Sequence, residues 1–349
     1  MSKKGYFHLN SVKPKVMGIG LLTLDVIMNG GDIEILDKVV GGSMGNVITI
    51  LSFFGWESYP IAYLGKDHAS KIILDDINKW NVKKNYIMQD ETVKTPIIVE
   101  KINNHLEQKK HEFNFVCPLC HSKLPRNRVI PNELVKDIIK TMPEVQVFYL
   151  DRLSRSALKI ANLHKKKGAI IFFEPHKVSK DTLFKECLKI TDILKYSLED
   201  IEYIPYNRDV YLEIISLGSE GVKYKLKGNL NNSKNHYEKI NAYHLNNIVD
   251  TAGAGDWLTA GIIHMLGQNG RGYLNNLLKS SIKEAMLFGQ SLSALNCSFE
   301  GARGLMYKFN KREINEMVKK IMRKKYVQIN NNKKYRKKNK DMIICPMCI

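Results

Sequence analysis

The sequence predicts an α/β protein of three layers, in which helices cover both faces of a mostly parallel central sheet and a small β lid lies beside it. Short apolar runs rich in β-branched and aromatic residues are typical of buried parallel strands, and they span residues 16–22, 59–64, 145–150, 169–173, 190–194 and 212–217. Amphipathic segments lie between the runs, and this alternation of strands and helices favours a parallel sheet. Residues 30–40 and 94–116 instead look extended and partly polar with no helix between their strands, which predicts the lid.

Several helices carry boundary signals. Ser43 is expected to cap a helix that has apolar residues at the 3.6-residue period and ends at Gly55. Residues 154–167 predict a second helix, because three lysines lie in its last turn and Gly168 follows it. Ligands of parallel sheets bind at the carboxyl ends of strands, so functional residues are expected directly after the strands.

The size and composition suit one large domain with a small appendage. The chain has 349 residues, of which 44% are apolar and 26% charged, so we expect a main domain over residues 1–310 and a basic helix and tail over 311–349. The N-terminus lacks the apolar segment of a secretory signal, and glycines and polar residues interrupt the longest uncharged stretch, residues 39–56. A cytoplasmic location without a membrane span is therefore expected.

The positive charge of the chain lies mostly in its tail. Residues 308–340 contain 14 Lys and Arg and 2 Asp and Glu, which is +12 of the formal +19. Such a tail can bind nucleic acid or another anionic surface. A solvated, lysine-rich helix and linker is the interpretation we favour.

Residues 250–256 read Asp-Thr-Ala-Gly-Ala-Gly-Asp and precede an amphipathic helix that ends at Gly267. Gly253, Ala254 and Gly255 let backbone N–H groups approach an oxyanion, and they lie at a helix N-terminus, which favours negative charge. This predicts an anion hole for a phosphoryl group in transfer. Asp256, in the first turn, can accept the proton of an attacking hydroxyl. A glycine-rich turn before an acidic helix start is common in proteins without this function. Whether residues 250–256 form a phosphoryl-transfer motif is therefore judged from their context in the rest of the sequence.

That context is a second glycine-rich pattern near the N-terminus. Gly41-Gly42-Ser43-Met44-Gly45-Asn46 opens a helix after Asp25, and Gly65-Lys66-Asp67 opens the next helix. Together with residues 250–256, these motifs resemble the ribokinase-like (PfkB) carbohydrate kinase family over nearly all of residues 15–310. Two signatures in the right order, about 200 residues apart, are more specific than either one alone.

The resemblance implies a ribokinase-like fold and an ATP-dependent kinase that phosphorylates a hydroxyl of a sugar or nucleoside, with Asp256 as the base. It implies substrate-binding residues whose carboxylate, amide and backbone groups suit a polyol, namely Asp25, Gly41, Gly42 and Asn46. It also implies nucleotide-binding residues, namely Ser216, Gly218, Gly221, Asn296 and Ala302. Arg303 has no role in the resemblance and is expected at the surface. Dimerisation through the lid is a further implication, since the edge of such a sheet would otherwise be exposed.

The sequence departs from the family at the magnesium motif. The family often has Asn-x-x-Glu after the fourth or fifth strand, whereas Ser197 and Asp200 stand at those two positions here. Both keep an oxygen group, and Mg²⁺ commonly binds through waters, so we expect the site to survive with adjusted geometry. The departure leaves an alternative open, a catalytically weak kinase-fold protein that binds nucleic acid or a protein partner through its tail.

Two Cys-Pro-x-Cys pairs resemble zinc knuckles, and together they supply a tetrahedral set of four thiolates, Cys117, Cys120, Cys345 and Cys348. The first pair lies in an insertion over residues 111–128, so the two pairs could meet only through the fold. The alternative is two unrelated pairs that are free or redox-active, and His111 and His121 are alternative ligands. Cys187 and Cys297 are expected to be buried thiols. Arg126 and Arg128 are expected to be solvated.

Overall fold

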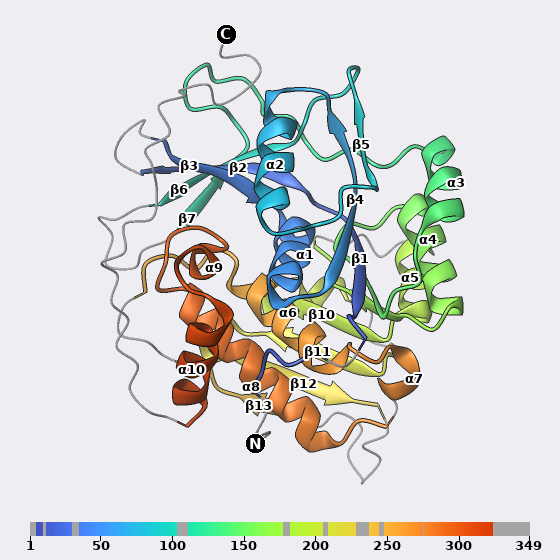
Figure 1. Cartoon of the computed structure of the whole chain (residues 1–349), viewed down its shortest axis with the longest axis vertical. Coiled ribbons are helices and arrows are strands. Elements are labelled where there is room, and N and C mark those ends of the chain that lie inside the picture. The colour runs from blue at the N-terminus through green and yellow to red at the C-terminus, as the bar shows by residue number, and fades with distance from the viewer. Residues whose placement is uncertain are drawn as a thin grey trace.

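A computed structural model of the chain describes residues 5–9, 12–29, 35–102, 111–176, 182–204, 209–227, 237–243, 248–274 and 276–323 (Figure 1). Its strands are β1 (Lys15–Ile19), β2 (Thr23–Asn29), β3 (Ile35–Gly41), β4 (Glu57–Gly65), β5 (Ile87–Asp90), β6 (Ile97–Ile102), β7 (His111–Asn114), β8 (Val147–Leu150), β9 (Ile170–Phe173), β10 (Ile193–Ser197), β11 (Leu212–Ser216), β12 (Val222–Leu226) and β13 (Glu238–Ile240). Its helices are α1 (Ser43–Phe54), α2 (His68–Lys79), α3 (Asn132–Thr141), α4 (Arg155–Lys166), α5 (Thr182–Ile190), α6 (Ala254–Leu266), α7 (Arg271–Leu274), α8 (Lys279–Asn296), α9 (Gly304–Lys308) and α10 (Lys311–Met322), with 3₁₀ turns η1 (Leu198–Tyr203) and η2 (Gly218–Glu220).

The central sheet has nine strands in the order β13-β12-β11-β10-β9-β8-β1-β4-β5. Neighbouring strands from β11 to β5 pair in parallel, and β12 alone runs antiparallel to both of its neighbours. The apolar runs identified in the sequence supply most of the parallel strands, so the predicted α/β class is confirmed.

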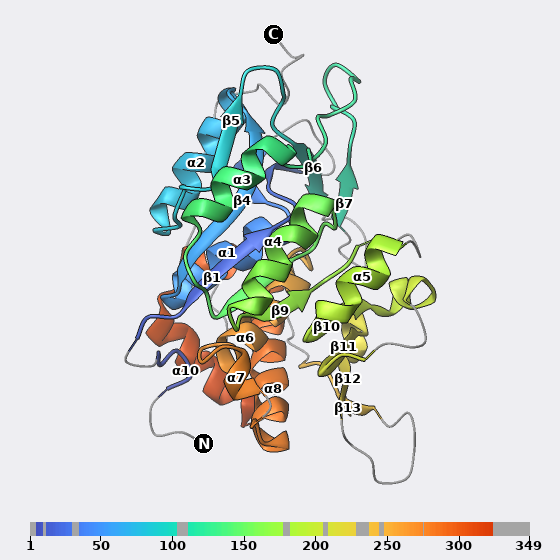
Figure 2. The same cartoon turned by 90° about the vertical axis from the view of Figure 1, so that its right-hand side faces the viewer.

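Helices cover both faces of this sheet (Figure 2). Successive side chains of a strand point to opposite faces, so Val16 of β1 packs in the core that contains α1, α6, α8 and α10. Its neighbour Met17 packs in the other core, against α3, α4 and α5. This alternation explains why the strands are apolar on both faces.

The lid is a separate four-stranded sheet in the order β3-β2-β6-β7 (Figure 1). Strands β3, β6 and β7 fall in the two predicted lid regions, whereas β2 lies outside both. Residues 30–34 and 103–110 of those regions lie outside the described residues. Strand β2 joins the central sheet to the lid, because it begins a few residues after β1 and pairs with both β3 and β6.

Two predicted boundaries were wrong. Ser43 is the first residue of α1 rather than its cap, since Gly42 is the N-cap and makes no side-chain cap hydrogen bond. The strand predicted over residues 190–194 lies three residues later, because α5 continues to Ile190 and β10 begins at Ile193. The expected C-cap at Gly55 is present. The second predicted helix is α4, with Ser154 as its N-cap, Lys167 as its C-cap and Gly168 just beyond at a φ of 85°.

Helix α10 packs in the same core as the rest of the chain, through Ile314, Val318 and Ile321. The N-terminal segment meets it there, because the N–H of Tyr6 donates to Asn315 Oδ1 at 2.8 Å. No helix among the described residues is long and apolar enough to cross a membrane.

Candidate active site

Two of the residues singled out in the sequence, Ser197 and Ser216, end the neighbouring parallel strands β10 and β11, and so lie at the carboxyl edge of the sheet. Helix α6 begins at the same edge, and it packs against α1. The chain enters the lid directly after β1, so the lid strands border this edge. Parallel α/β sheets bind ligands in this place.

The predicted anion hole is a tightly fitted turn. Gly253 is the N-cap of α6 with a φ of 71°, and a Cβ on it would lie 2.1 Å from the carbonyl oxygen of Ala302. Asp250 holds the turn, because its carboxylate accepts from the N–H of Ala252 (2.9 Å) and of Gly301 (2.7 Å). The start of α6 is therefore fixed from below while its first N–H groups remain free of intrahelical partners.

Asp256 and Asn46 meet at this turn, although 210 positions separate them in the sequence. The Asn46 amide donates to Asp256 Oδ2 at 2.8 Å. Burial and the nearby Glu174 carboxylate raise the pKa of Asp256 well above its ordinary value, while Asn46 and Lys195 lower it. A carboxylate with a raised pKa, held by an amide beside an anion hole, is a candidate general base.

A second pair of charges, missed in the sequence, lies beneath the anion hole. Lys195 is 2% exposed and forms an ion pair with Glu174 Oε1. Glu174 Oε2 accepts from the Thr259 hydroxyl (2.8 Å), on the next turn of α6 after Asp256, and from the Tyr149 hydroxyl (3.1 Å). The Lys195 ammonium lies 3.7 Å from where a Cβ of Gly255 would be, so a positive charge sits directly below the first turn.

The predicted substrate residues Asp25 and Gly41 also lie together. They are directly adjacent in the lid, where a Cβ on Gly41 would lie 1.8 Å from Asp25 Oδ2, so only glycine fits. The Thr23 hydroxyl donates to Asp25 Oδ1 at 2.7 Å. Burial raises the pKa of Asp25 to about 6, although Thr23 and Arg303 lower it.

Asp151, at the end of β8, is another carboxylate that the sequence patterns did not reveal. It accepts from the N–H groups of Leu21 (2.9 Å) and Met44 (3.1 Å), and so ties the turn after β1 to the start of α1. Burial raises its pKa to about 6. A lone acidic residue directly after an apolar strand was the available signal for Asp151 and for Glu174.

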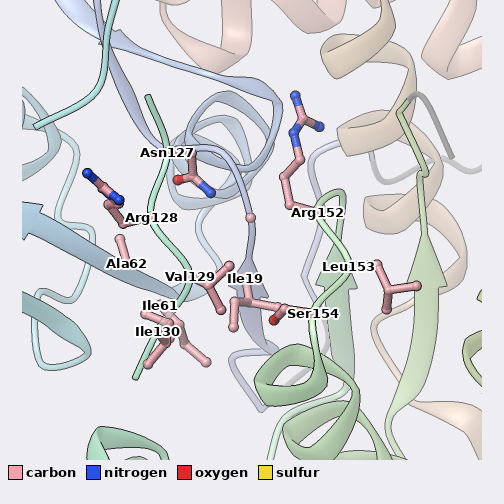
Figure 3. A pocket seen from close by; sticks show the side chains of 11 residues that line it. Ile19, Ile61, Ala62, Asn127, Arg128, Val129, Ile130, Arg152, Leu153 and Ser154 are labelled. Atoms are coloured by element: carbon pink, nitrogen blue, oxygen red, sulfur yellow. The ribbon is translucent and has the colours of Figure 1, made fainter. Parts of the chain in front are cut away.

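A small pocket lies beside this turn, between the end of β1, the middle of β4 and the residues just after β8 (Figure 3). Ile19, Ile61 and Ile130 form its apolar part, and Asn127 and Arg152 lie on either side of the turn after β1. The Arg152 guanidinium folds back on the chain and donates to the carbonyl of Asp151 at 3.1 Å. Arg126 and Arg128 are exposed, as the sequence suggested, and Arg128 lines the pocket.

The predicted nucleotide loop is the turn between β11 and β12. Gly218 and Gly221 have φ angles of 58° and 104°, and the Ser216 hydroxyl donates to the carbonyl of Tyr196 (3.3 Å). Ser216 is in register with Ser197 of β10, whose hydroxyl donates to Asp200 Oδ2 (2.7 Å). These half-buried oxygen groups, which face the loop from the next strand, fit the oxygen ligands and water ligands that Mg²⁺ prefers.

Two of the expected nucleotide residues, Asn296 and Ala302, are buried. Asn296 is fully buried, and its amide donates to the carbonyls of Ala252 (3.1 Å) and Ala302 (3.2 Å) while its oxygen accepts from the N–H of Leu305 (3.1 Å). Asn296 thus joins the segments around the anion hole. The surface position expected for Arg303 was wrong, because Arg303 is 2% exposed.

The first cysteine pair lies in a short hairpin after β7. The Cys117 N–H donates to the carbonyl of Ser122 (2.9 Å), and the backbone N–H of His121 donates to the carbonyl of Cys117 (3.0 Å). His121 has a left-handed φ of 57°. Cys117 is buried and Cys120 exposed, whereas Cys345 and Cys348 lie outside the described residues. Within the described part of the chain, no group of three or more His, Cys, Asp or Glu side chains could hold a metal ion.

The other cysteines are isolated thiols. Cys187 is buried, as predicted, but Cys297 is only half-buried, which corrects that expectation. Burial raises the pKa of both thiols to about 12, so they are protonated near neutral pH.

A carboxylate beside an anion-binding helix N-terminus, facing polar groups suited to a polyol, is the arrangement of a phosphotransferase that acts on an alcohol group. The pfkB family of carbohydrate kinases matches residues 13–308. The chain belongs to this family, as its motifs implied, and ATP and a divalent cation are typical of the family's enzymes.

Relatives and solved structures agree with this assignment. A probable chloroplastic fructokinase of Arabidopsis thaliana is 25% identical over 323 residues, which are 83% of this chain and 79% of the relative. Ribokinase of Arabidopsis thaliana, solved with ribose and ATP, has a TM-score of 0.63 at 15% identity and covers 89% of this chain and 99% of its own. Aminoimidazole riboside kinase of Salmonella enterica has a TM-score of 0.65 at 18% identity, with 87% and 99% covered. The ribokinase-like fold is thereby confirmed.

Proposed function

We propose that the protein transfers the γ-phosphate of ATP to a hydroxyl of a sugar or nucleoside, with Asp256 as the base. The observation that carries the proposal is the hydrogen bond between Asn46 and Asp256. It joins a residue of the substrate signature to the anion-hole helix, so a hydroxyl bound by Asn46 and a phosphoryl group at the start of α6 would meet at one point.

The geometry suggests an in-line transfer. Asp25 and Asn46 would bind hydroxyls of the acceptor, and the loop over residues 216–221 would hold the nucleotide. The N–H groups at the start of α6 would stabilise the charge that develops on the phosphoryl oxygens. Asp256 would take the proton of the attacking hydroxyl, which is oriented by the same contacts.

Ser197 and Asp200 are the residues that would hold Mg²⁺, through water or directly. When bound, Mg²⁺ neutralises charge on the phosphate oxygens. The two side chains already share a hydrogen bond, so Asp200 is held in place by Ser197.

The acceptor class follows from the chemistry of the substrate residues. Carboxylate and amide groups suit neutral polyols, and the relatives above are named as kinases of fructose, ribose and a riboside. The pocket in Figure 3, which adjoins the turn after β1, would receive the end of the acceptor that distinguishes one sugar or nucleoside from another.

Replacing the base tests the proposal. Asp256→Asn should lower kcat by about 10²–10⁴-fold, because the amide cannot take the hydroxyl proton, while the dissociation constant for ATP changes little. Turnover is measured on a panel of sugars and nucleosides, and ATP binding by calorimetry. Near-full activity of Asp256→Asn would refute the assignment of the base.

A second candidate function is that of a catalytically weak kinase-fold binding protein, which the departures from the family motif at Ser197 and Asp200 leave open. The same substrate panel distinguishes it from an active kinase. Wild-type protein that binds ATP but turns over no acceptor would support it. Salt-dependent binding of nucleic acid, lost on removal of residues 308–349, would then identify the tail as the binding element.

We also propose that Cys117, Cys120, Cys345 and Cys348 bind one structural Zn²⁺. The hairpin that holds the first pair supports this, because His121 has a left-handed φ and the Cys117 N–H donates to the carbonyl of Ser122, so the chain reverses directly after the pair. Metal analysis of full-length protein should find about one zinc per chain, and the double variants Cys117→Ser/Cys120→Ser and Cys345→Ser/Cys348→Ser should each lose it. Cys187→Ser is the control, and wild-type protein with only a trace of zinc would exclude the site.

A second copy of the chain is the partner we propose for the lid. Phe113 of β7 and Phe115 and Val116 just after it are exposed apolar residues at the edge of the lid sheet, where pairing with another sheet would cover them. Sedimentation of wild-type protein should show a dimer, and Phe113→Ser/Phe115→Ser should shift it to a monomer. A wild-type monomer at micromolar concentration would contradict this.

A further inference from the structure

Arg303 is a buried arginine that the proposed chemistry does not use. Its Nη2 donates to Asp76 Oδ2 of α2 and to the carbonyl of Val40 in β3, at 2.7 Å each. The ion pair joins residues 227 positions apart, and both side chains are at most 3% exposed. Arg303 therefore links the C-terminal part of the chain to the lid.

The Val40 peptide is held on both sides. Its N–H donates to Asp76 Oδ2 (3.0 Å), and its carbonyl accepts from Arg303 (2.7 Å). The Tyr307 hydroxyl, 2.9 Å from both Asp76 oxygens, orients the carboxylate. Val40 directly precedes Gly41, which packs against the carboxylate of Asp25. The ion pair thus fixes the backbone on which the candidate substrate residues are built.

The other end of the same link touches the anion hole. Arg303 follows Gly301, whose N–H is held by Asp250, and Ala302, whose carbonyl lies against Gly253. The Trp257 indole of α6 donates to that carbonyl at 3.1 Å. A shift of the first turn of α6 would therefore be passed through residues 301–303 to the Val40 peptide.

Stability alone is a weak reason for such a pair. A buried ion pair is often no more stabilising than well-packed apolar side chains of similar volume, because both charges lose their hydration. Apolar side chains, however, could not hydrogen-bond to the N–H and the C=O of the Val40 peptide, as Asp76 and Arg303 do. The arrangement favours a geometric role for Arg303, which at 2% exposure has almost no surface with which to touch substrate.

We propose that Arg303 is a positioning residue that couples nucleotide binding to acceptor binding. Nucleotide in the anion hole fixes residues 301–303, Arg303 and Asp76 then fix Val40, and Gly41 and Asp25 are held ready for the acceptor. By thermodynamic reciprocity the acceptor strengthens nucleotide binding by the same factor. The proposal rests on the function proposed above, in that it assigns the nucleotide to α6 and the acceptor to Asp25.

Binding measurements with a non-hydrolysable ATP analogue test the coupling. The acceptor is the best substrate of the turnover panel, and its Kd is measured with and without the analogue. We expect the analogue to tighten acceptor binding in the wild type by about fivefold or more, and in Arg303→Lys by less than about twofold. An unchanged factor in Arg303→Lys, or no coupling in the wild type, would overturn the proposal.

The matched control is a second ion pair, formed at 2.6 Å by Lys165 of α4 and Asp192 just before β10, whose side chains are 17% and 8% exposed. Lys165→Met should lower the melting temperature and leave the coupling factor unchanged. Tyr307→Phe provides a milder variant if Arg303→Lys folds poorly. It removes the hydroxyl that contacts both Asp76 oxygens, keeps the ion pair, and should reduce the coupling factor partly. If Arg303→Lys does not fold, a full wild-type coupling factor in Tyr307→Phe would overturn the proposal.

Hydrogen exchange gives a readout that needs no acceptor. Binding of the analogue alone should slow amide exchange over residues 38–42 in the wild type and in Lys165→Met, but not in Arg303→Lys. Absence of this protection in wild-type protein that binds the analogue would overturn the coupling. Failure of the proposed function looks different, since protection would be present while no acceptor is turned over.

Discussion

Four acidic residues, Asp25, Asp151, Glu174 and Asp256, lie in one site. Burial penalises the charged form of a carboxylate and raises the pKa of Asp25, Asp151 and Asp256, and the negative charge of Glu174 raises the pKa of Asp151 and Asp256 further. Lys195 and Arg303 supply the opposing positive charges, since Lys195 lowers the pKa of Asp256 and Arg303 lowers that of Asp25. Several buried carboxylates whose charged form is disfavoured thus lie where an acceptor and a phosphoryl group would meet.

This arrangement fixes the sign of the pH dependence. Asp25 and Asp256 are expected to act as carboxylates, so lowering the pH through their raised pKa values should remove activity. We expect kcat/KM for the acceptor to fall as the pH drops below about 6, the value to which burial raises the pKa of Asp25. A pH–rate profile with full kcat/KM down to pH 5 would contradict the ionised state assigned to these residues.

Lys195 provides a sharper test of the same electrostatics. Lys195→Met removes the positive charge that lowers the pKa of Asp256, so the acidic limb of the profile should move to higher pH. It also removes the charge below the anion hole, and kcat should fall by about 10²-fold, as for loss of one donor to a developing anion. Lys195→Arg should restore much of the activity; a profile that keeps its wild-type limb in Lys195→Met would show that the pair is only structural.

At this scale the sequence identified residues that belong to motifs and missed those that act alone. Gly41, Asn46 and Asp256 stand in glycine-rich patterns whose spacing carries information, and Asp25 was identified by its place after the first apolar run. Glu174, Lys195, Asp151 and Asp76 are single charged residues whose partners lie far along the chain. Arg303 and Asp76, 227 positions apart, share no local pattern. Only the fold brings such residues together.

Among the elements, the apolar parallel strands were the easiest to predict, since burial on both faces makes their sequence continuous and hydrophobic. Strand β2 was missed because Thr23 and Asp25 interrupt its apolar residues, and the reason is functional: the strand carries a candidate substrate carboxylate. Strands β12 and β13 were missed because their outer positions are lysines and glutamate. Lid and edge strands have partly polar faces, so they lack the apolar signal.

The tight fit of the turn that opens α6 can be tested by comparing alanine substitutions at two glycines that both have a left-handed φ, Gly253 and Gly168. Gly253→Ala must place a Cβ 2.1 Å from the Ala302 carbonyl at a φ of 71°, whereas Gly168→Ala has a φ of 85° and nothing within 4 Å. Gly168→Ala should therefore lower the free energy of unfolding by only the cost of a left-handed alanine, about 1–2 kcal/mol. Gly253→Ala should cost more and should also abolish turnover, measured by denaturant unfolding and kinase assay. Equal costs in both variants would show that the turn is not tightly fitted.

On the scale of the whole molecule, the last described helix is part of the core. Ile314, Val318 and Ile321 of α10 are buried with α8, and Asn315 binds the N-terminal segment. The predicted domain boundary at residue 310 stays a prediction. Truncation of the chain on either side of α10 tests it. A chain of residues 1–323 should keep the melting temperature and activity of the full chain, apart from any contribution of zinc. A chain of residues 1–310 should lose several degrees in melting temperature, and equal stability of both would show that α10 is dispensable.

The 210 positions between Asn46 and Asp256 also bear on how the protein is made. Ribosomes add about 5–20 residues per second, so α1 would leave the ribosome roughly 10–40 s before α6. During that interval the nascent chain holds Asp25, Gly41 and Asn46 without the helix that completes their site. Contacts of such long sequence separation form late in folding, so the onset of phosphoryl transfer during synthesis would mark the moment when the two ends of the chain have joined.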